Sequence, residues 1–240
     1  MPLPLVMVHG FMGGSQQWKL QAQQFSQSQN IIAPDLPGFA SNAHQTAPDT
    51  IEGFARFVFK ELDKQNVDRI TLLGHSMGGM IVQEMVALEP HRIDRLILYG
   101  TASSGDLPER FETFETSKKR IQNDGVSASA RRISATWFLD QHRAKQYETC
   151  AAIAEQSSKQ ATMAGLDAMK SWSRTANLQS IECPTLIIWG EFDRTYHWPQ
   201  IEKLWKAIPE VSLAVLPGCS HAAHLEKPNL FNAVLSDFLV

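Results

Sequence analysis

Short apolar runs alternate with longer stretches of helical period along most of the chain. The runs that end near Gly, Pro or Asp predict strands at residues 5–8, 31–33, 69–73, 95–99, 185–189 and 211–216. The stretches between them predict helices at residues 15–28, 49–65, 77–88, 198–207 and 229–238. This order is typical of the α/β class, with a mostly parallel six-stranded sheet covered by helices on both faces.

The alternation of strands and helices breaks between residues 102 and 180. Apolar residues recur there at helical spacing and no strand run is found, while Gly125 and Gly165 interrupt the pattern and predict helix breaks. We therefore expect a single domain over residues 1–240 with a helical lid inserted at about residues 102–180.

Composition narrows the classes of partner. A chain of 240 residues with 43% apolar residues is long enough for one sizeable core. Its net charge of -3 provides no excess of basic groups for a nucleic acid or an anionic membrane. The expected partner is therefore a small molecule, and we expect a monomer or a homodimer.

Two features of the sequence indicate the cellular compartment: the residues that follow Met1 and the cysteines. Apolar residues 5–8 follow Met1 without a basic region, so we expect no secretory signal, and no apolar run reaches the length of a membrane span. Cys150, Cys183 and Cys219 are odd in number and scattered, which suits reduced thiols. A cytoplasmic location is expected.

A candidate nucleophile lies between a predicted strand and a predicted helix. Gly74, His75, Ser76, Met77 and Gly78 spell the G-x-S-x-G pattern in the strand-turn-helix context that it requires. A one-residue turn forces strained dihedrals on the serine and brings backbones close on both sides, so a side chain at either glycine would clash. The turn also places Ser76 near the positive end of a helix dipole.

A serine that attacks an acyl carbon produces an oxyanion, which needs two backbone N–H donors. The amide of Met77 is the first candidate. The glycine-rich loop of residues 9–14 follows the first strand and supplies the second, which we assign to Phe11. His9 is expected to orient this loop through hydrogen bonds.

The candidate base is His221, which lies between the last strand and the last helix. His224 is its rival, three residues nearer the helix. The candidate acid is Asp193, which follows the strand at 185–189, with Glu191 as the alternative. The order serine, acid, histidine is the one that α/β-hydrolases use. Cys219, His221 and His224 hint at a metal site, but a structural zinc usually takes four ligands, and we expect no metal.

At this point the chain resembles the α/β-hydrolase superfamily over essentially its whole length. The motifs that carry the resemblance are residues 9–11, 35–39, 74–79 and 190–193, and His221 with Glu226 and Pro228. Within the superfamily, the short lid with Trp137, Phe138 and Trp172 looks most like the small carboxylesterases and 3-oxoadipate enol-lactonases.

The chain departs from the family pattern in two places. Members usually have an antiparallel hairpin before the first loop, and only eight residues precede His9, so we expect one sheet edge to be missing or shortened. Ala40 stands where the family commonly has glycine, and a local loop change is expected. Ser76 also differs from the aspartate that related epoxide hydrolases and haloalkane dehalogenases carry there, which leaves acyl chemistry.

These features predict a carboxylic ester hydrolase that cleaves a small ester or lactone through an acyl-enzyme, without a cofactor. An apolar pocket lined by Trp137, Phe138, Trp172 and Met12 is expected under the lid, beside Phe11 and Met77. Three arginines in the lid region are candidates for holding a substrate carboxylate: Arg131, Arg132 and Arg174. Carbon-carbon bond hydrolysis of a ring-cleavage product, a perhydrolase side activity and a weakly hydrolytic small-ligand receptor remain alternatives.

Overall fold

The predicted strands form one parallel sheet in the computed structural model, which describes residues 2–240. In the order β2-β1-β3-β4-β5-β6 each strand pairs in parallel with its neighbour. The strands are β1 (Leu5–Val8), β2 (Ile31–Ile32), β3 (Ile70–His75), β4 (Ile93–Tyr99), β5 (Thr185–Gly190) and β6 (Val211–Leu216). The predicted six-stranded parallel sheet is confirmed.

The register of the central strands brings distant loops to one edge of the sheet. Val8 of β1 lies opposite Gly74 of β3, and His75 of β3 lies opposite Tyr99 of β4. Because parallel strands end at the same edge, the loops that follow β1, β3 and β4 start side by side. Loops after β5 and β6 join the same edge, since Gly190 lies opposite Leu216.

Most predicted helices are present, with shifted ends. The helices are α1 (Lys19–Phe25), α2 (Ile51–Asp63), α3 (Met77–Leu88), α4 (Phe114–Thr136), α5 (Tyr147–Glu155), α6 (Lys159–Ser171), α7 (Trp198–Ala207), α8 (Ala223–Glu226) and α9 (Pro228–Leu239). The helix predicted at 15–28 opens with a 3-10 turn (Ser15–Trp18) before α1. The helix predicted at 49–65 begins later, because the Thr50 side chain accepts a hydrogen bond from Gly53 and caps it.

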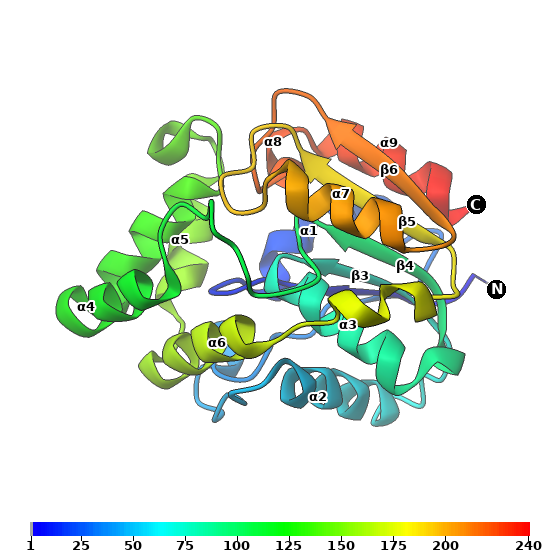
Figure 1. The fold of residues 1–240 in the computed structure, drawn as a ribbon, viewed down its shortest axis with the longest axis horizontal. Coiled ribbons are helices and arrows are strands. Elements are labelled where there is room, and N and C mark those ends of the chain that lie inside the picture. Colours follow the sequence, from blue (N-terminus) through cyan, green and yellow to red (C-terminus); the bar gives the residue numbers. More distant parts are fainter. Residues whose placement is uncertain (1) are drawn as a thin grey trace.

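Two apolar layers cover the two faces of the sheet, and alternate strand residues supply them. On one face, Leu5, Met7 and Leu73 pack with Phe25 of α1 and Phe231 of α9. The other face packs against α2, α3 and α7, and its strand residues and helix residues include Val6, Val8, Leu72, Phe54, Met80 and Leu204. Figure 1 shows α2, α3 and α7 together on the near side of the sheet.

The segment between β4 and β5 holds α4, α5 and α6, which lie at the end of the sheet toward which the strands point (Figure 1). Gly125 breaks α4 with a φ of 83°, as predicted. The predicted break at Gly165 is wrong, since this residue lies inside α6. Close packing explains why residue 165 is a glycine, because a Cβ there would come within 3.1 Å of the Phe11 ring. The single domain with a lid stays a prediction.

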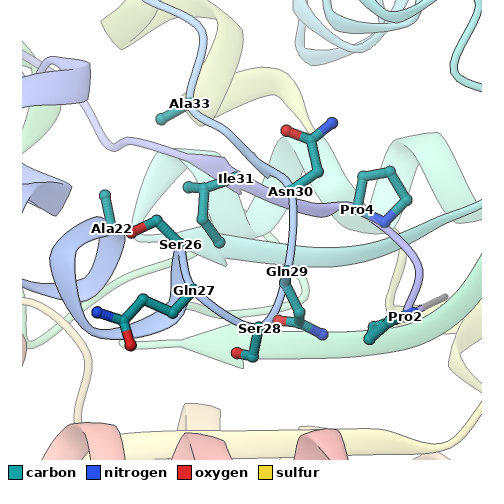
Figure 2. A pocket seen from close by; sticks show the side chains of 10 residues that line it. All are labelled: Pro2, Pro4, Ala22, Ser26, Gln27, Ser28, Gln29, Asn30, Ile31 and Ala33. Carbon is teal, nitrogen blue, oxygen red and sulfur yellow. The ribbon is translucent and has the colours of Figure 1, made fainter.

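The sheet edge formed by β2 matches the expected departure from the family pattern. Within residues 2–240 no strand precedes β1, and β2 has only two residues. A shallow open hollow of about 950 Å³ lies along this edge, between Pro2 and Pro4 and the turn that leads into β2 (Figure 2). It contains none of the predicted site residues, so its size says nothing about the chemistry considered below.

Candidate active site

Ser76 occupies the turn between β3 and α3 in a strained conformation. Its φ of 58° and ψ of -122° lie outside the regions that a serine ordinarily adopts. The Ser76 amide donates to the carbonyl of Tyr99, and the Ser76 carbonyl accepts from the hydroxyl of Thr101. These bonds to the segment after β4 hold the turn in place.

Glycines on both sides of Ser76 allow this turn. A Cβ at position 74 would lie 2.3 Å from the carbonyl oxygen of Gly78, and a Cβ at position 78 would lie 2.3 Å from that of Val8. Both distances are far shorter than a carbon-oxygen contact allows, so the expected clash at either glycine is confirmed. The turn therefore depends on the G-x-S-x-G pattern itself.

His221 and Asp193 form a buried pair. The Nδ1 atom of His221 lies 2.7 Å from Oδ2 of Asp193. The other carboxylate oxygen, Oδ1, accepts from the amides of Thr195 and Tyr196 at 2.7 and 3.1 Å. Since a carboxylate only accepts, Nδ1 of His221 carries the hydrogen and Nε2 is left available as an acceptor. The rival carboxylate Glu191 accepts instead from the amide of Gly218 on the surface.

The imidazole of His221 lies between two rings. The ring of His75 lies 4.4 Å from it, centroid to centroid, and the ring of Tyr196 lies 5.7 Å away. His75 donates from Nε2 to the carbonyl of His221, and the hydroxyl of Tyr99 donates to the same oxygen. Burial lowers the pKa of His75 well below its ordinary value, so this ring is a neutral support.

His224 occupies a different environment from His221. Its ring is buried against Trp18 at 4.7 Å, and its Nδ1 atom lies 3.0 Å from the hydroxyl of Tyr99. Burial, with a smaller effect of the nearby His221, lowers the pKa of His224 to about 3. The structure thus places His221, and not His224, against a carboxylate.

The two predicted oxyanion donors lie next to Ser76. Met77 is the first residue of α3, where a helix amide has no partner in its own helix. A Cβ at Gly10, directly before Phe11, would come within 2.8 Å of Ser76 Cβ, so the first loop approaches the serine closely. Among the hydrogen bonds of residues 2–240, neither the Phe11 amide nor the Met77 amide is a donor.

His9 holds the first loop through both ring nitrogens, as predicted. Its Nδ1 atom donates to the carbonyl of Gly10 at 2.8 Å, and its Nε2 atom accepts from the amide of Leu36 at 2.9 Å. Burial lowers the pKa of His9, which keeps the ring neutral and preserves this pattern. Asp35 ties the same region to the amide of Ser15.

Ser76 and His221 line one small pocket beneath the helices between β4 and β5. Its volume is about 20 Å³, which is little more than the space that one water needs. Half-buried or buried apolar residues and one cation make up most of its wall, and its lining consists of Phe11, Ser76, Leu107, Arg110, Phe111, Ile133, Trp137, Met169, Thr195, Tyr196 and His221.

The predicted substrate-binding residues separate into two groups. Trp137 lines the pocket of Ser76, and Phe138, Trp172 and Met12 do not. Phe138 is buried and lines a different hollow, with Leu139 and Leu225, and its carbonyl accepts from Arg194. The Trp172 indole donates to Glu84 at 2.8 Å, and Met12 is wholly buried.

Two pocket residues and one residue beneath the His221–Asp193 pair have no motif that marks them in the sequence. Tyr196 and Arg110 lie in loops where neither period nor spacing predicts a direction. Gly100 lies beneath the His221–Asp193 pair, where a Cβ would be 3.2 Å from Nδ1 of His221. Of these three residues, only Gly100 could have been recognised from the sequence, because a glycine at the carboxyl end of a central strand often marks a place where another group lies close to the backbone.

Metal ligation, membrane insertion and thiol chemistry concern other parts of the described chain. Within residues 2–240, no three His, Cys, Asp or Glu side chains are grouped so that they could hold a metal ion. No helix in that range is long and apolar enough to cross a membrane. Cys150, Cys183 and Cys219 are free thiols, and burial raises the pKa of each.

Known proteins resemble this chain along nearly its full length. "Putative carbamate hydrolase RutD" of Pseudomonas savastanoi pv. phaseolicola is 25% identical over 241 residues, which cover 98% of this chain and 93% of that protein. The enol-lactonase of Burkholderia xenovorans LB400 superposes with a TM-score of 0.91 at 21% identity, covering 100% of this chain and 92% of that one.

A thermophilic esterase from Thermogutta terrifontis superposes with a TM-score of 0.89 at 24% identity, covering 99% of this chain and 89% of that one. At such identity the solved structures establish a shared fold. The family model described as alpha/beta hydrolase fold matches residues 4–228. The sheet order, the turn at Ser76 and this match agree, and the chain belongs to the alpha/beta hydrolase fold family.

Proposed function

We propose that the chain is a serine hydrolase that cleaves a carboxylic ester or lactone of a small molecule through an acyl-enzyme. The observation that carries the proposal is the 2.7 Å contact between His221 Nδ1 and Asp193 Oδ2, with His221 lining the same pocket as Ser76. A carboxylate on Nδ1 leaves Nε2 free to accept a proton, which is what activation of a serine requires.

In the proposed reaction, Ser76 Oγ attacks the carbonyl carbon and its proton passes to Nε2 of His221. Asp193 holds the ring in the required tautomer and stabilises the imidazolium. The C–O bond to the leaving group then breaks, and the leaving oxygen takes the proton from Nε2. Water attacks the acyl-Ser76 ester in the second half and gives a proton to the same nitrogen. The C–Oγ bond then breaks, Ser76 Oγ takes that proton from Nε2, and the free acid is released.

The amides of Phe11 and Met77 are the proposed donors to the tetrahedral oxyanion. Neither has another acceptor within residues 2–240, so both are available without breaking a bond. Preorganised donors of this kind each contribute roughly 3–4 kcal/mol to transition-state stabilisation in acyl-transfer enzymes. The strained Ser76 turn, on this proposal, exists to aim Oγ and the Met77 amide at one point.

The helices between β4 and β5 are the proposed lid. A pocket of about 20 Å³ is too small for an ester, so this segment must move before substrate enters. The end of α4 is tied to the loop of His221, because the amide of Ala222 donates to the carbonyl of Trp137 and Glu226 accepts from the amide of Leu139. We place the movement in the part of the lid away from this anchor, around the break of α4 at Gly125.

The activities named for the relatives agree with chemistry at a carbonyl carbon. They include an enol-lactonase, an esterase and RutD, which is described as a carbamate hydrolase. Ester, lactone and carbamate cleavage all pass through a tetrahedral oxyanion, and one serine site serves all three. Esters and lactones are proposed first because the pocket wall is mainly apolar around Ser76.

The test uses 4-nitrophenyl butyrate with the wild type and Ser76→Ala. The variant should lose at least about 10³-fold in kcat, because no other group forms the acyl-enzyme. Ser129→Ala is the matched control, since Ser129 is buried in α4 and does not line the pocket. An organophosphate should transfer its phosphoryl group to Ser76 Oγ of the wild type with loss of its leaving group, which mass spectrometry detects. Equal hydrolysis by wild type and Ser76→Ala would refute the proposal.

A further inference from the structure

Arg110 is a cation on the wall of the pocket that contains Ser76 and His221. It lies between β4 and α4, next to Phe111, which lines the same pocket. A guanidinium is charged at every pH of interest, so a cation faces the space where substrate must bind. Burial beside the pocket lowers the pKa of Arg110, which marks a desolvated position.

The guanidinium is held in one orientation. Its Cζ atom lies 4.3 Å from the ring centroid of Phe111 and 4.9 Å from that of Phe114. Its Nη1 atom donates to the carbonyl of Glu112 at 2.6 Å and to the hydroxyl of Ser117 at 3.1 Å. A cation fixed in this way loses little conformational entropy when a ligand binds.

The other edge of the guanidinium has no protein partner. Within residues 2–240, Nε and Nη2 of Arg110 donate no hydrogen bond, and no carboxylate oxygen lies within 4.0 Å of its nitrogens. The Nε and Nη2 hydrogens are parallel donors that match the two oxygens of a carboxylate. The free edge therefore has the donor geometry that fits a carboxylate.

The surrounding charges do not neutralise Arg110. Glu109, the neighbouring acid in the sequence, lies 3.9 Å from His197 Nδ1, and the Glu112 carboxylate is shared by Arg132 at 2.8 Å and Arg120 at 3.6 Å. Two arginines thus share the Glu112 carboxylate, whereas Arg110 donates only to the backbone carbonyl of Glu112. A buried cation without a counter-ion is costly, and a bound anion would remove that cost.

The arginines suggested by sequence do not have this arrangement. Arg131 pairs with Glu148 and Arg174 pairs with Glu84, and neither lines the pocket. Arg132 is paired with Glu112. Arg110 differs from all three because it combines a place in the pocket with an unpaired edge.

We propose that Arg110 forms an anion subsite in the pocket of Ser76, and that the substrate is an ester or lactone whose acyl part carries a free carboxylate. The inference rests on the proposed serine hydrolase function. It specifies the substrate class: the carboxylate binds to Nε and Nη2 of Arg110, while the carbonyl to be attacked lies at Ser76.

The first experiment compares two substrates that differ only in charge, the mono-4-nitrophenyl ester of adipic acid and its methyl ester. At pH 8 the wild type should prefer the free acid by at least tenfold in kcat/KM. Arg110→Gln should lower that preference at least tenfold, and Arg110→Lys, which keeps the charge but not the parallel donors, should keep part of it. Arg131→Gln is the control and should keep all of it.

The proposed subsite would be refuted if the wild type had nearly equal kcat/KM for the two substrates. It would also be refuted if Arg110→Gln kept the wild-type ratio of kcat/KM for the free acid over the methyl ester. Loss of turnover in Ser76→Ala would show in the same assay that the hydrolase function still holds. A calorimetric experiment separates the two further: Ser76→Ala protein should bind monomethyl adipate at least tenfold more tightly than dimethyl adipate, and the additional change Arg110→Gln should remove the difference. Equal binding of both ligands would also overturn the subsite, whatever the catalytic result.

Discussion

The ring of Tyr196 lies 5.7 Å from the ring of His221, centroid to centroid, with their planes inclined by 29°. The tyrosine is buried, and burial raises the pKa of its hydroxyl to about 12, while the nearby Ser76 side chain opposes the rise as a hydrogen-bonding group. Tyr196 therefore shares one pocket with the proposed base and the proposed nucleophile. It also contributes its amide to Asp193.

Removing the hydroxyl or the ring of Tyr196 should have different effects. Tyr196→Phe keeps the ring beside His221 and loses one hydrogen-bonding group, worth about 1 kcal/mol, so kcat should fall about fivefold. Tyr196→Leu also removes the stacked ring, so its kcat should be lower than that of Tyr196→Phe. Steady-state hydrolysis of 4-nitrophenyl butyrate measures both.

Tyr147→Phe is the control for Tyr196→Phe. Tyr147 is a buried tyrosine of α5 whose hydroxyl donates to the carbonyl of Arg131, and it does not line the pocket. Loss of the Tyr147 hydroxyl should lower the thermal unfolding midpoint and leave kcat nearly unchanged. Similar losses of kcat in the two variants would mean that Tyr196 acts only through stability.

Gly100→Ala should disturb the His221–Asp193 pair directly. The φ of Gly100 is 49°, and a Cβ there would lie 3.2 Å from Nδ1 of His221 and 3.3 Å from Oδ2 of Asp193. An alanine in this conformation costs about 1–2 kcal/mol. The added methyl also forces the hydrogen-bonded pair to shift, so kcat should fall at least about tenfold, because catalysis depends on that geometry.

Gly125→Ala separates strain from contact. Gly125 has a φ of 83°, but no atom lies within 4 Å of the position that a Cβ would take. Both variants should lose stability in urea unfolding, and only Gly100→Ala should lose kcat. An equal loss of kcat in Gly125→Ala would contradict the proposed role of the contact.

The sheet and the Ser76 turn could be predicted because local rules determine them. Apolar runs that end at glycine or aspartate give parallel strands, and only glycine tolerates the 2.3 Å approaches at positions 74 and 78. The pairing of His221 with Asp193 also followed from position, since parallel strands deliver their loops to one edge. Helix boundaries differ from the predicted ones where a capping residue such as Thr50 sets the start of the helix.

The pocket wall could not be predicted in the same way. Trp137 and Trp172 have similar sequence contexts, yet one lines the pocket and the other donates to Glu84. Helices that cross a sheet edge have no register rule comparable with strand pairing, so the direction of a side chain depends on tertiary packing. Gly165 shows the same limit, because packing against Phe11 and not a helix break accounts for it.

The two carboxylates of the loop after β5 allow a matched comparison. Asp193→Asn should lower kcat by roughly 10⁴-fold, because an amide favours the wrong tautomer of His221. Glu191→Gln should leave kcat nearly unchanged, since Glu191 accepts only from the amide of Gly218. Near-normal hydrolysis by Asp193→Asn would exclude it as the acid.

The buried histidine His224 should make the fold sensitive to acid. Burial lowers the pKa of His224 from 6.5 to about 3. As the pH falls, the unfolded chain therefore binds a proton at this histidine near pH 6.5, whereas the folded chain binds it only near pH 3. Between these values the unfolded state holds more protons, and stability is lost as the pH falls. The free energy of unfolding should decrease by about 1.4 kcal/mol per pH unit for this histidine alone.

His224→Phe should reduce that slope. The new ring can pack on Trp18, the Nε2 atom that it removes has no hydrogen-bond partner, and Tyr99 still donates to the carbonyl of His221. Urea unfolding at pH 4.5, 5.5 and 6.5 should give an average slope lower by about 1.2 kcal/mol per pH unit than in the wild type, because the unfolded histidine is only partly protonated near pH 6.5. His44→Gln, at an exposed histidine, is the control and should keep the wild-type slope. If His224→Phe keeps it too, His224 is not the group that resists protonation in the folded state.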